Sequence, residues 1–282
     1  MLTLTPNQLP NDLLQLAHPI KKLHIIGENF ENLMKRPRLA VVGSRKISPY
    51  GRGVTENITA YLASKGVVIV SGLALGTDSI AHQACINSGG QTIAVMACGP
   101  DRVYPGSHTA LARNIVEMGG VILTEYDTGH RPFAFNFLER NRIIAAMSEG
   151  VLVTEAAARS GSLNTANHAL QLGKPVFAVP GNITNPLSAG CNNLIKAGAI
   201  PVTSPQDILD ALKWQDIGTI PLAVTGNTDE ERIIIALLKK GISDGADMLA
   251  GSGLPASAFN QALTMLEITR RIRPLGANHW SL

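Results

Sequence analysis

LAVVGSRKISP, at residues 39–49, and VVIVSGLALGTD, at residues 67–78, are the stretches that decide the fold. Each begins with an apolar run, which predicts a buried strand, and passes through a glycine-containing polar turn to a helix start. Ser48 is a good N-cap, and Pro49 suits the first helical position after it. The order of strand, turn and helix is typical of a sheet with parallel strands.

The same alternation continues along the chain. Because the apolar runs are almost continuous, both faces of the sheet must be covered. We therefore predict an α/β domain with an extended Rossmann-like fold, a mostly parallel sheet and helices on both faces. Further strands are expected at 92–97, 121–126, 150–154 and 176–179, and helices at 48–65, 76–89, 107–118, 137–148 and 162–172.

The sequence on either side of this pattern differs from it. Residues 1–38 predict turns and one or two short helices, an N-terminal extension packing on the main domain at 39–215. A change to Gly, Pro and Thr without periodicity predicts a linker at 216–224. Three helical patterns and a strand pair predict a winged-helix-like module at 225–282, whose expected recognition helix, 256–266, has no Lys or Arg. A role in protein contact is therefore at least as well supported for this module as DNA binding.

Composition excludes several classes of protein. The chain has 282 residues, 45% of them apolar and 16% charged, with net charge +3, so it is neither disordered nor strongly basic. Cys85, Cys98 and Cys191 form no pattern typical of zinc or disulfides. The N-terminus lacks the features of a signal peptide, and no apolar run approaches the ~18 residues of a membrane span. We expect a cytoplasmic protein with no membrane contact, metal or cofactor.

Polar, glycine-rich sequence is expected at the edge where the parallel strands end, which is where such sheets bind ligands. Glycine allows close backbone approach, an Arg can hold a phosphate, and helix starts favour anions. The loop at 71–78 matches neither the dinucleotide GxGxxG pattern nor a Walker A loop. Ser160 or Ser162 is expected to cap the helix at 162–172. The candidate residues are Gly43, Ser44 and Arg45, then Ser71, Gly72 and Gly76, and finally Ser160, Gly161 and Ser162.

Phenylalanine and arginine gather in one segment. The protein is only 4% aromatic, yet three of its six Phe lie within residues 133–137, and three Arg lie within residues 131–142. Rings at alternate positions can insert into a core. Rings beside guanidinium groups can instead stack the bases of single-stranded nucleic acid, and we favour this interpretation.

Five motifs, in this order, closely resemble the DNA-processing protein A family, DprA, also called Smf. The resemblance covers residues 39–215 strongly, and residues 266–280 are similar to the winged-helix tail of many members. The motifs are Gly43-Ser44-Arg45, SGLALGTDSIAH at 71–82, FNFLERNRIIAAMS at 135–148, EAAARSGSLNTA at 155–166 and VFAVPGNITNPLSAGCNNLIKAGA at 176–199.

The resemblance implies single-stranded DNA binding without sequence preference, homodimers, and loading of the RecA recombinase during natural transformation. We expect no catalytic activity, because the sequence contains no GxSxG or HExxH motif and no Cys near an evident base. By that resemblance Arg45 would hold a phosphate, Phe137 would stack a base, and Arg140 and Asn141 would frame the pocket. Close backbone and hydroxyl contacts would come from Gly43, Ser44, Gly72, Ser160 and Ser162. We place the expected dimer surface around 190–210, near Leu194 and Ile200.

Three departures from the family pattern stand out. Ala134 and Phe135 occupy the stretch where many relatives carry a Lys, and Arg131 is a candidate to compensate. Leu138 stands where many relatives have Pro. The helical N-terminal domain of many members is not expected from residues 1–38.

Two alternatives remain open. Nucleotide phosphoribohydrolases resembling the LOG family share the fold superfamily, but their catalytic acid has no counterpart in the turn at 160–165. Glu125, Glu139 and Glu155 near strand ends could form a carboxylate cluster, although glutamates paired with Arg are commoner. The second alternative is a nucleotide-sensing regulator whose winged helix reads duplex DNA.

Overall fold

The computed structural model describes residues 1–214, 228–269 and 271–281. Contacts divide the chain into two units, residues 1–221 and residues 222–282, which we call the first and second units. The predicted linker at 216–224 lies outside the described residues.

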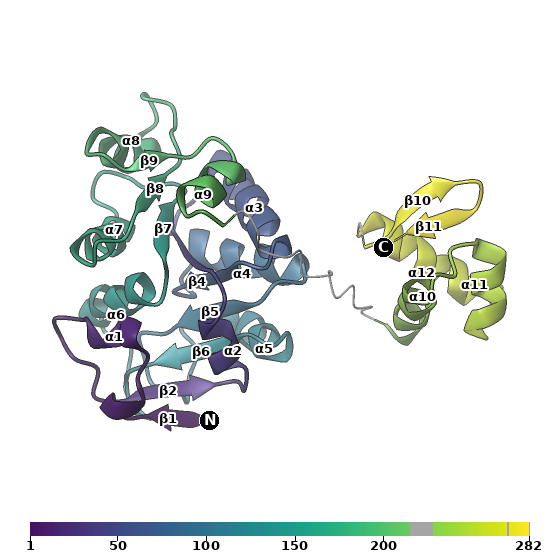
Figure 1. The fold of residues 1–282 in the computed structure, drawn as a ribbon, viewed down its shortest axis with the longest axis horizontal. Helices are drawn as coiled ribbons and strands as arrows, with labels where there is room; N and C mark the ends of the chain where they lie inside the picture. The colour runs from purple at the N-terminus through teal and green to yellow at the C-terminus, as the bar shows by residue number, and fades with distance from the viewer. Residues whose placement is uncertain (215–227, 270, 282) are drawn as a thin grey trace. The chain divides into compact units, whose positions relative to one another are not determined.

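The first unit is built on a nine-stranded sheet in the order β1-β2-β6-β5-β4-β3-β7-β8-β9 (Figure 1). The strands from β6 to β9 in this order pair in parallel, whereas β1–β2 and β2–β6 pair antiparallel. The sheet is therefore mostly parallel, as predicted. Its strands are β1 (Leu2–Leu4), β2 (Leu23–Ile26), β3 (Arg38–Val42), β4 (Val68–Ser71), β5 (Thr92–Val95), β6 (Val121–Thr124), β7 (Gly150–Val153), β8 (Val176–Ala178) and β9 (Ile200–Pro201).

Helices cover both faces of this sheet (Figure 1). One face packs on α6 (Ala134–Ala146), α7 (Ser162–Gln171) and α8 (Ala189–Lys196). The other packs on α3 (Pro49–Ser64), α4 (Thr77–Asn87), α5 (Thr109–Glu117) and α9 (Pro205–Ala211). Strand side chains alternate between these layers: Ala40 and Val42 face one core, Leu39 and Val41 the other. Both faces are thus buried, which explains the continuous apolar strands.

The ends of α3 have the N-cap, the proline and the glycine that the sequence predicts there. Ser48 is the N-cap of α3, and its hydroxyl accepts a hydrogen bond from the Gly51 amide at 3.1 Å. Pro49 occupies the first helical position. Gly66, just beyond α3, has φ +90°, a left-handed conformation that favours glycine.

The N-terminal segment differs from the expectation of turns and short helices. It contributes two strands, and β2 pairs with β6 to widen the central sheet. The short helices α1 (Asn11–Leu14) and α2 (Phe30–Met34) bury Leu13 and Leu33. Thr3 and His24 interrupt the apolar pattern of these two strands, so neither forms the continuous apolar run by which the central strands are recognised. The segment therefore adds two strands, residues 2–4 and 23–26, to the sheet, and is not only an extension packed on it.

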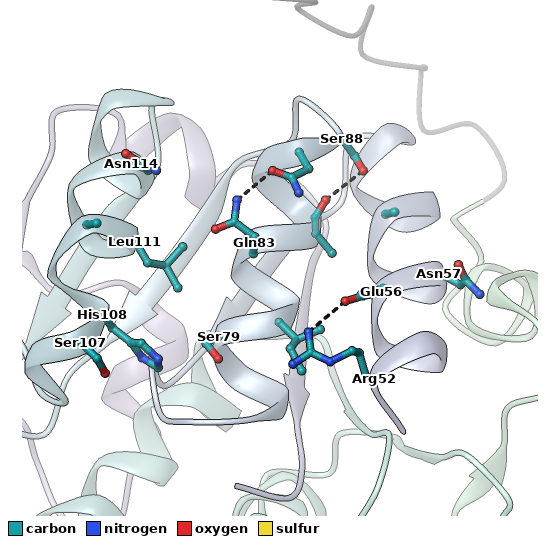
Figure 2. Close-up of a pocket in the computed structure, with 15 residues that line it drawn as sticks. Arg52, Glu56, Asn57, Ser79, Gln83, Ser88, Ser107, His108, Leu111 and Asn114 are labelled. Carbon is teal, nitrogen blue, oxygen red and sulfur yellow. Dashed lines mark hydrogen bonds and ion pairs between the residues drawn. The ribbon is translucent and has the colours of Figure 1, made fainter. Parts of the chain in front are cut away.

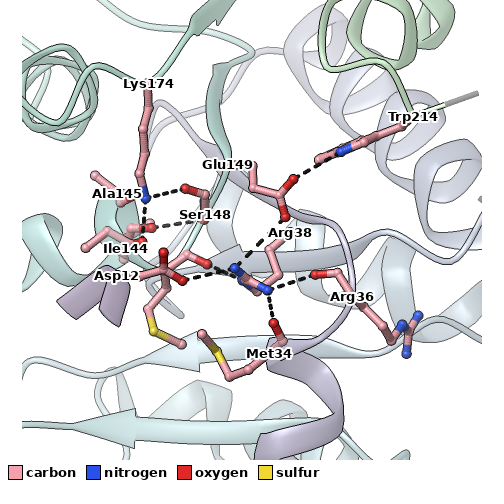
Figure 3. Close-up of polar contacts among 12 residues, drawn as sticks. Asp12, Met34, Arg36, Arg38, Ile144, Ala145, Ser148, Glu149, Lys174 and Trp214 are labelled. Atoms are coloured by element: carbon pink, nitrogen blue, oxygen red, sulfur yellow. Dashed lines mark hydrogen bonds and ion pairs between the residues drawn. The ribbon is translucent and has the colours of Figure 1, made fainter. Parts of the chain in front are cut away.

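The buried Arg38 ties the N-terminal segment to the start of β3 (Figure 3). Its guanidinium donates to the carbonyl oxygens of Met147 at 2.7 Å and Arg36 at 2.8 Å, and to that of Met34. It also lies 3.1 Å from the Asp12 carboxylate. A buried guanidinium is tolerated when hydrogen bonds and a counter-charge satisfy it, as they do here.

The second unit contains three helices and a hairpin, which are the elements that the sequence predicts. They are α10 (Asp229–Lys239), α11 (Gly245–Ser252), α12 (Ala256–Ile268), β10 (Arg273–Gly276) and β11 (His279–Ser281). Its own core includes Ile234, Met248, Phe259 and Leu266. No helix in the described part of the chain is long and apolar enough to cross a membrane.

Replacing Arg38 should destabilise the first unit. In Arg38→Leu three carbonyl groups lose their donor and Asp12 loses its counter-charge, so we expect a loss of about 2–4 kcal/mol in the free energy of unfolding. Urea unfolding, followed by the fluorescence of Trp214, measures the change in unfolding free energy. Because the chain has a second Trp, Trp280, the measurement is made in a Trp280→Phe background. Arg52→Ala, which removes only an exposed pair with Glu56, is the control and should change stability by less than ~0.5 kcal/mol. Equal effects of the two substitutions would contradict a structural role for Arg38.

Candidate nucleic-acid interface

The candidate site lies where β3 and β7, neighbours in the sheet, end side by side. The chain winds outward from β3 to β4, β5 and β6, then crosses back to β7 and continues to β8 and β9. The gap between β3 and β7 is therefore the topological switch point, where open α/β sheets bind ligands. A pocket of about 720 Å³ opens there.

Nine of the twelve candidate residues line this pocket. They are Gly43, Ser44, Arg45, Phe137, Arg140, Asn141, Ser160, Gly161 and Ser162. They come from three segments far apart in the sequence, which the sheet topology brings to one place.

The loop after β3 forms the first wall. The Ser44 amide donates to the carbonyl oxygen of Glu155 at 2.7 Å, and the Thr77 amide donates to that of Ser44 at 3.1 Å. A Cβ at Gly43 would lie 2.5 Å from Thr77 Oγ1 and 2.8 Å from the Glu155 carbonyl oxygen, so only glycine fits. The loop is thereby clamped between β7 and α4, which leaves the side chain of Arg45 exposed at the rim.

Phe137 provides an aromatic surface in the pocket. Its ring is half-buried and has two cations near it: the Arg45 guanidinium lies 5.1 Å and that of Arg140 6.0 Å from the ring centre. The ring of Tyr104 lies 5.4 Å from it, at 52°. An aromatic face with adjacent positive charge is suited to a planar base attached to a phosphate.

Arg140 forms the floor of the pocket. It is 3% exposed, and its guanidinium donates to the carbonyl oxygens of Gly72 at 2.7 Å and Val95. Burial lowers its pKa to about 10, so it keeps its charge at neutral pH. Burial also raises the pKa of the neighbouring Asp78 carboxyl, and the charge of Arg140 opposes that rise. Arg140 thus supplies a positive charge that is held in place through Nη1, which donates to both carbonyls, while its Nε is buried without a hydrogen-bond partner among the described residues.

The start of α7 forms the opposite wall. The expectation that a serine caps this helix is wrong: Gly161 occupies the N-cap position without a side-chain cap. The hydroxyls of Ser160 and Ser162 instead bond each other at 2.8 Å. Asn141 joins α6 to this turn, because its amide nitrogen lies 3.3 Å from the Gly161 carbonyl oxygen. The first amides of α7 are already engaged: that of Ser162 donates to the Ser160 hydroxyl at 3.4 Å, and those of Leu163 and Asn164 donate to the carbonyl oxygens of Ser160 and Gly161 at 3.2 Å.

Three candidate residues do not line the pocket but support it. The Ser71 hydroxyl is buried and donates to the Val41 carbonyl oxygen at 2.6 Å. A side chain at Gly72 would meet the guanidinium of Arg140. Gly76 has φ +79°, and a Cβ there would overlap the carbonyl oxygen of Ser44. Ser71, Gly72 and Gly76 therefore shape the site through packing and not through direct contact.

The charged residues near the site are largely engaged elsewhere. Glu155 accepts hydrogen bonds from the amide of Ser48 at 2.8 Å and from its hydroxyl at 2.5 Å. Glu125 pairs with Arg142 at 2.5 Å, and burial raises the pKa of Glu125. Arg142, expected beside the rings, is thus turned into the protein. Among the described residues, no group of three His, Cys, Asp or Glu is placed to hold a metal ion.

Several residues that line the pocket were not among the sequence candidates, and those with a charged or aromatic side chain are Lys46, Asp78 and Tyr104. The turn containing Tyr104, at 99–106, is easily taken as structural because of its Pro and Gly residues. Its position after β5, on the same sheet edge, was the available signal.

A second hollow, of about 610 Å³, lies between α3, α4 and α5 (Figure 2). Its one Arg, Arg52, pairs with Glu56 at 3.3 Å, and Gln83 bonds Asn87 at 2.8 Å. Of the described residues that line it, none is Phe, Tyr or Trp. This hollow therefore offers neither the rings nor the available cation found at the switch point.

Comparison with known proteins identifies the family. The model of DNA recombination-mediator protein A matches residues 1–213. The chain belongs to this family. It is 49% identical over 177 residues to Protein Smf of Escherichia coli and 46% identical over 178 residues to DprA of Streptococcus pneumoniae. These alignments cover 63% of this chain but 47% and 62% of the two relatives, so the chain spans about half to two thirds of their length.

Solved structures of family members agree with the fold. The chain is similar to the X-ray structure of DprA from Streptococcus pneumoniae, with a TM-score of 0.68, 42% identity, and coverage of 74% of this chain and 73% of that one. It is also similar to DprA from Helicobacter pylori, a structure that concerns that protein's single-stranded DNA binding mode. Here the TM-score is 0.66, the identity 33%, and the coverage 75% of this chain and 96% of that one. The expected family and the mostly parallel Rossmann-like sheet are confirmed.

Two glycine substitutions test the close packing at the site. Gly76→Ala places a Cβ against Ser44 and forces alanine into a left-handed conformation, so we expect a loss of about 2 kcal/mol or more in unfolding free energy. Gly53→Ala lies in α3 with open space around its Cβ and should stabilise by ~0.5–1 kcal/mol. Urea unfolding of the full chain measures both. A neutral Gly76→Ala would contradict the clamped-loop geometry.

Proposed function

We propose that this chain binds single-stranded DNA along the carboxyl edge of its sheet, protects it, and loads RecA onto it during natural transformation or recombination. The observation that supports DNA binding best is the Phe137 ring with the guanidinium of Arg45 5.1 Å from its centre, at the switch point. The single-stranded DNA binding of the Helicobacter pylori relative supports the same assignment. No catalytic role is proposed, because Asp78, the acid that lines the pocket, has its carboxylate engaged by the amides of Gly72 and Ala74.

Arg45 and Phe137 contact different parts of one nucleotide, the phosphate and the base. A base that stacks on Phe137 competes with Arg45 for the space beside the ring. Arg45 is exposed, so its guanidinium can move outward and meet the phosphate of the same nucleotide. Arg140 stays in place beneath them and contributes a steady positive potential. Because every base has a flat face, this arrangement does not select a sequence.

The family's description as a recombination mediator supports handing the strand to RecA. We also propose a homodimer through the outer edge of the sheet. There β9 is exposed on both of its residues, including Ile200, and Leu194 on α8 is half-buried. Two copies joined at such an edge would extend the DNA track and satisfy the edge strand.

Fluorescence anisotropy with a labelled oligo-dT and a matching duplex tests DNA binding. We expect the full chain to prefer the single strand and to bind less tightly as salt rises, because phosphate contacts release counterions. Equal binding of the duplex, or no binding at all, would contradict the proposal.

Substitution of Arg45 and Phe137 separates phosphate contact from stacking. Arg45→Ala should lower affinity and make the slope of log K against log salt shallower by about 0.7, the value for one single-strand phosphate contact. Phe137→Ala should lower affinity by ~1–3 kcal/mol with little change in slope. Arg52→Ala, in the second hollow, is the control and should leave both unchanged. Equal slopes for Arg45→Ala and Phe137→Ala would contradict this division of roles.

A further inference from the structure

Four aromatic rings form a continuous run beside the pocket, which we call the aromatic ladder: Tyr126, His130, Phe133 and Phe135. The rings of Tyr126 and His130 are stacked 4.4 Å apart, and the Phe133 ring meets His130 edge-on at 5.9 Å. The rings of Phe133 and Phe135 are 5.8 Å apart and within 5° of parallel. None of these four residues lines the pocket.

The ladder is held in place by hydrogen bonds beneath it. Asn136 is 1% exposed, and its Oδ1 accepts a hydrogen bond from the Phe133 amide at 2.9 Å and lies 3.4 Å from His130 Nε2. The Gly99 amide donates to the His130 carbonyl oxygen at 3.0 Å. Tyr126 Oη lies 3.1 Å from a carboxylate oxygen of Glu139. The rings are therefore presented in a defined arrangement, which lowers the entropy cost of binding.

The outer rings of the ladder are exposed. Phe133 is 49% and Phe135 58% exposed, in a protein with six Phe. Exposing large rings forgoes the ~1.5–3 kcal/mol that full burial of each would contribute. Neighbouring exposed rings of this kind mark a binding surface more often than isolated exposed apolar residues do.

Two rings of the ladder are next to pocket-lining residues in the sequence. Pro132, Ala134 and Phe137 line the pocket, and Phe133 and Phe135 alternate with them along the same short segment. Because side chains two residues apart on a helix point to different sides, a strand that leaves the pocket at Phe137 has to pass around the start of α6 to reach the ladder.

The charges around the ladder suit a polyanion. Arg131 is exposed and, among the described residues, makes no ion pair. Of the nearby acids, Asp127 lies 3.2 Å from Lys22 and Asp101 lies 3.0 Å from Arg102. Glu139, at the Tyr126 end of the ladder, makes no ion pair among the described residues and instead accepts a hydrogen bond from Tyr126. Arg131 is thus available for a phosphate beside the rings.

We propose that the aromatic ladder is a second base-stacking subsite, which takes the nucleotides that follow the one on Phe137, with Arg131 on their backbone. This inference rests on the proposed single-stranded DNA binding. A base inserted between two rings needs about twice the 3.4 Å stacking distance, which exceeds the 5.8 Å between Phe133 and Phe135. The base therefore stacks on the outward face of Phe135 and not between the two rings.

The test compares short and long DNA. The full chain and its variants are titrated with oligo-dT of about 6 and about 20 nucleotides, a range that spans one to several stacking sites. Phe135→Ala should weaken binding of the long strand by about 5-fold or more and of the short strand by less than about 2-fold. Phe137→Ala should weaken both. Because Phe135 is exposed, its truncation leaves the core intact.

Two further substitutions of Phe135 distinguish the loss of ring stacking from the loss of apolar contact area. Phe135→Tyr should bind the long strand as the wild type does, whereas Phe135→Leu should behave like Phe135→Ala. In a long strand carrying 2-aminopurine at successive positions, at least one position should lose its quenching in Phe135→Ala while the quenching due to Phe137 persists.

The possible failures are distinguishable. If the wild type binds neither strand, both the proposed function and the second subsite are refuted. If Phe137→Ala weakens binding but Phe135→Ala leaves both strands unaffected, DNA binding stands and the ladder subsite is refuted. If Phe135→Ala changes only self-association, measured by sedimentation, the ladder is a protein contact and the inference is refuted.

Discussion

The close approach of three backbone segments at the ends of β3, β7 and α4 is the constraint on which the site depends. The Ser44 amide and carbonyl bridge Glu155 and Thr77, and the two glycines beside them, Gly43 and Gly76, leave no room for a side chain. This packing uses backbone groups for structure and so directs the Arg45 side chain outward. The same approach brings the α7 start close enough to complete the pocket.

Buried polar groups beneath the pocket give it a permanent charge. Arg140 donates to the carbonyls of Gly72 and Val95, so it cannot follow a ligand as a flexible surface cation would. Arg45 above it is exposed and can move. One guanidinium held in place and one that can move, both near the Phe137 ring, combine a constant attraction with an adjustable contact, which suits a ligand of variable sequence.

Much of the fold is predictable from periodicity and caps, because each central strand is a short apolar run that ends near glycine. The strands β1 and β2 were missed, since Thr3 and His24 interrupt their apolar pattern and their place in the sheet follows only from the pairing of β1 with β2 and of β2 with β6. At the site, residue type correctly placed Arg45 and Phe137 on one edge. It could not show that Ser71 and Arg142 turn inward, because that depends on carboxylates and carbonyls far away in the sequence.

The most direct test of the central claim is amide hydrogen exchange of the full chain with and without oligo-dT. We predict slower exchange on DNA binding at the β3–α3 loop (residues 43–46), the start of α6 (133–141) and the start of α7 (160–163). The helices α3, α4 and α5 around the second hollow should be unchanged. Protection confined to those helices or to the second unit, with none at residues 43–46, would contradict it.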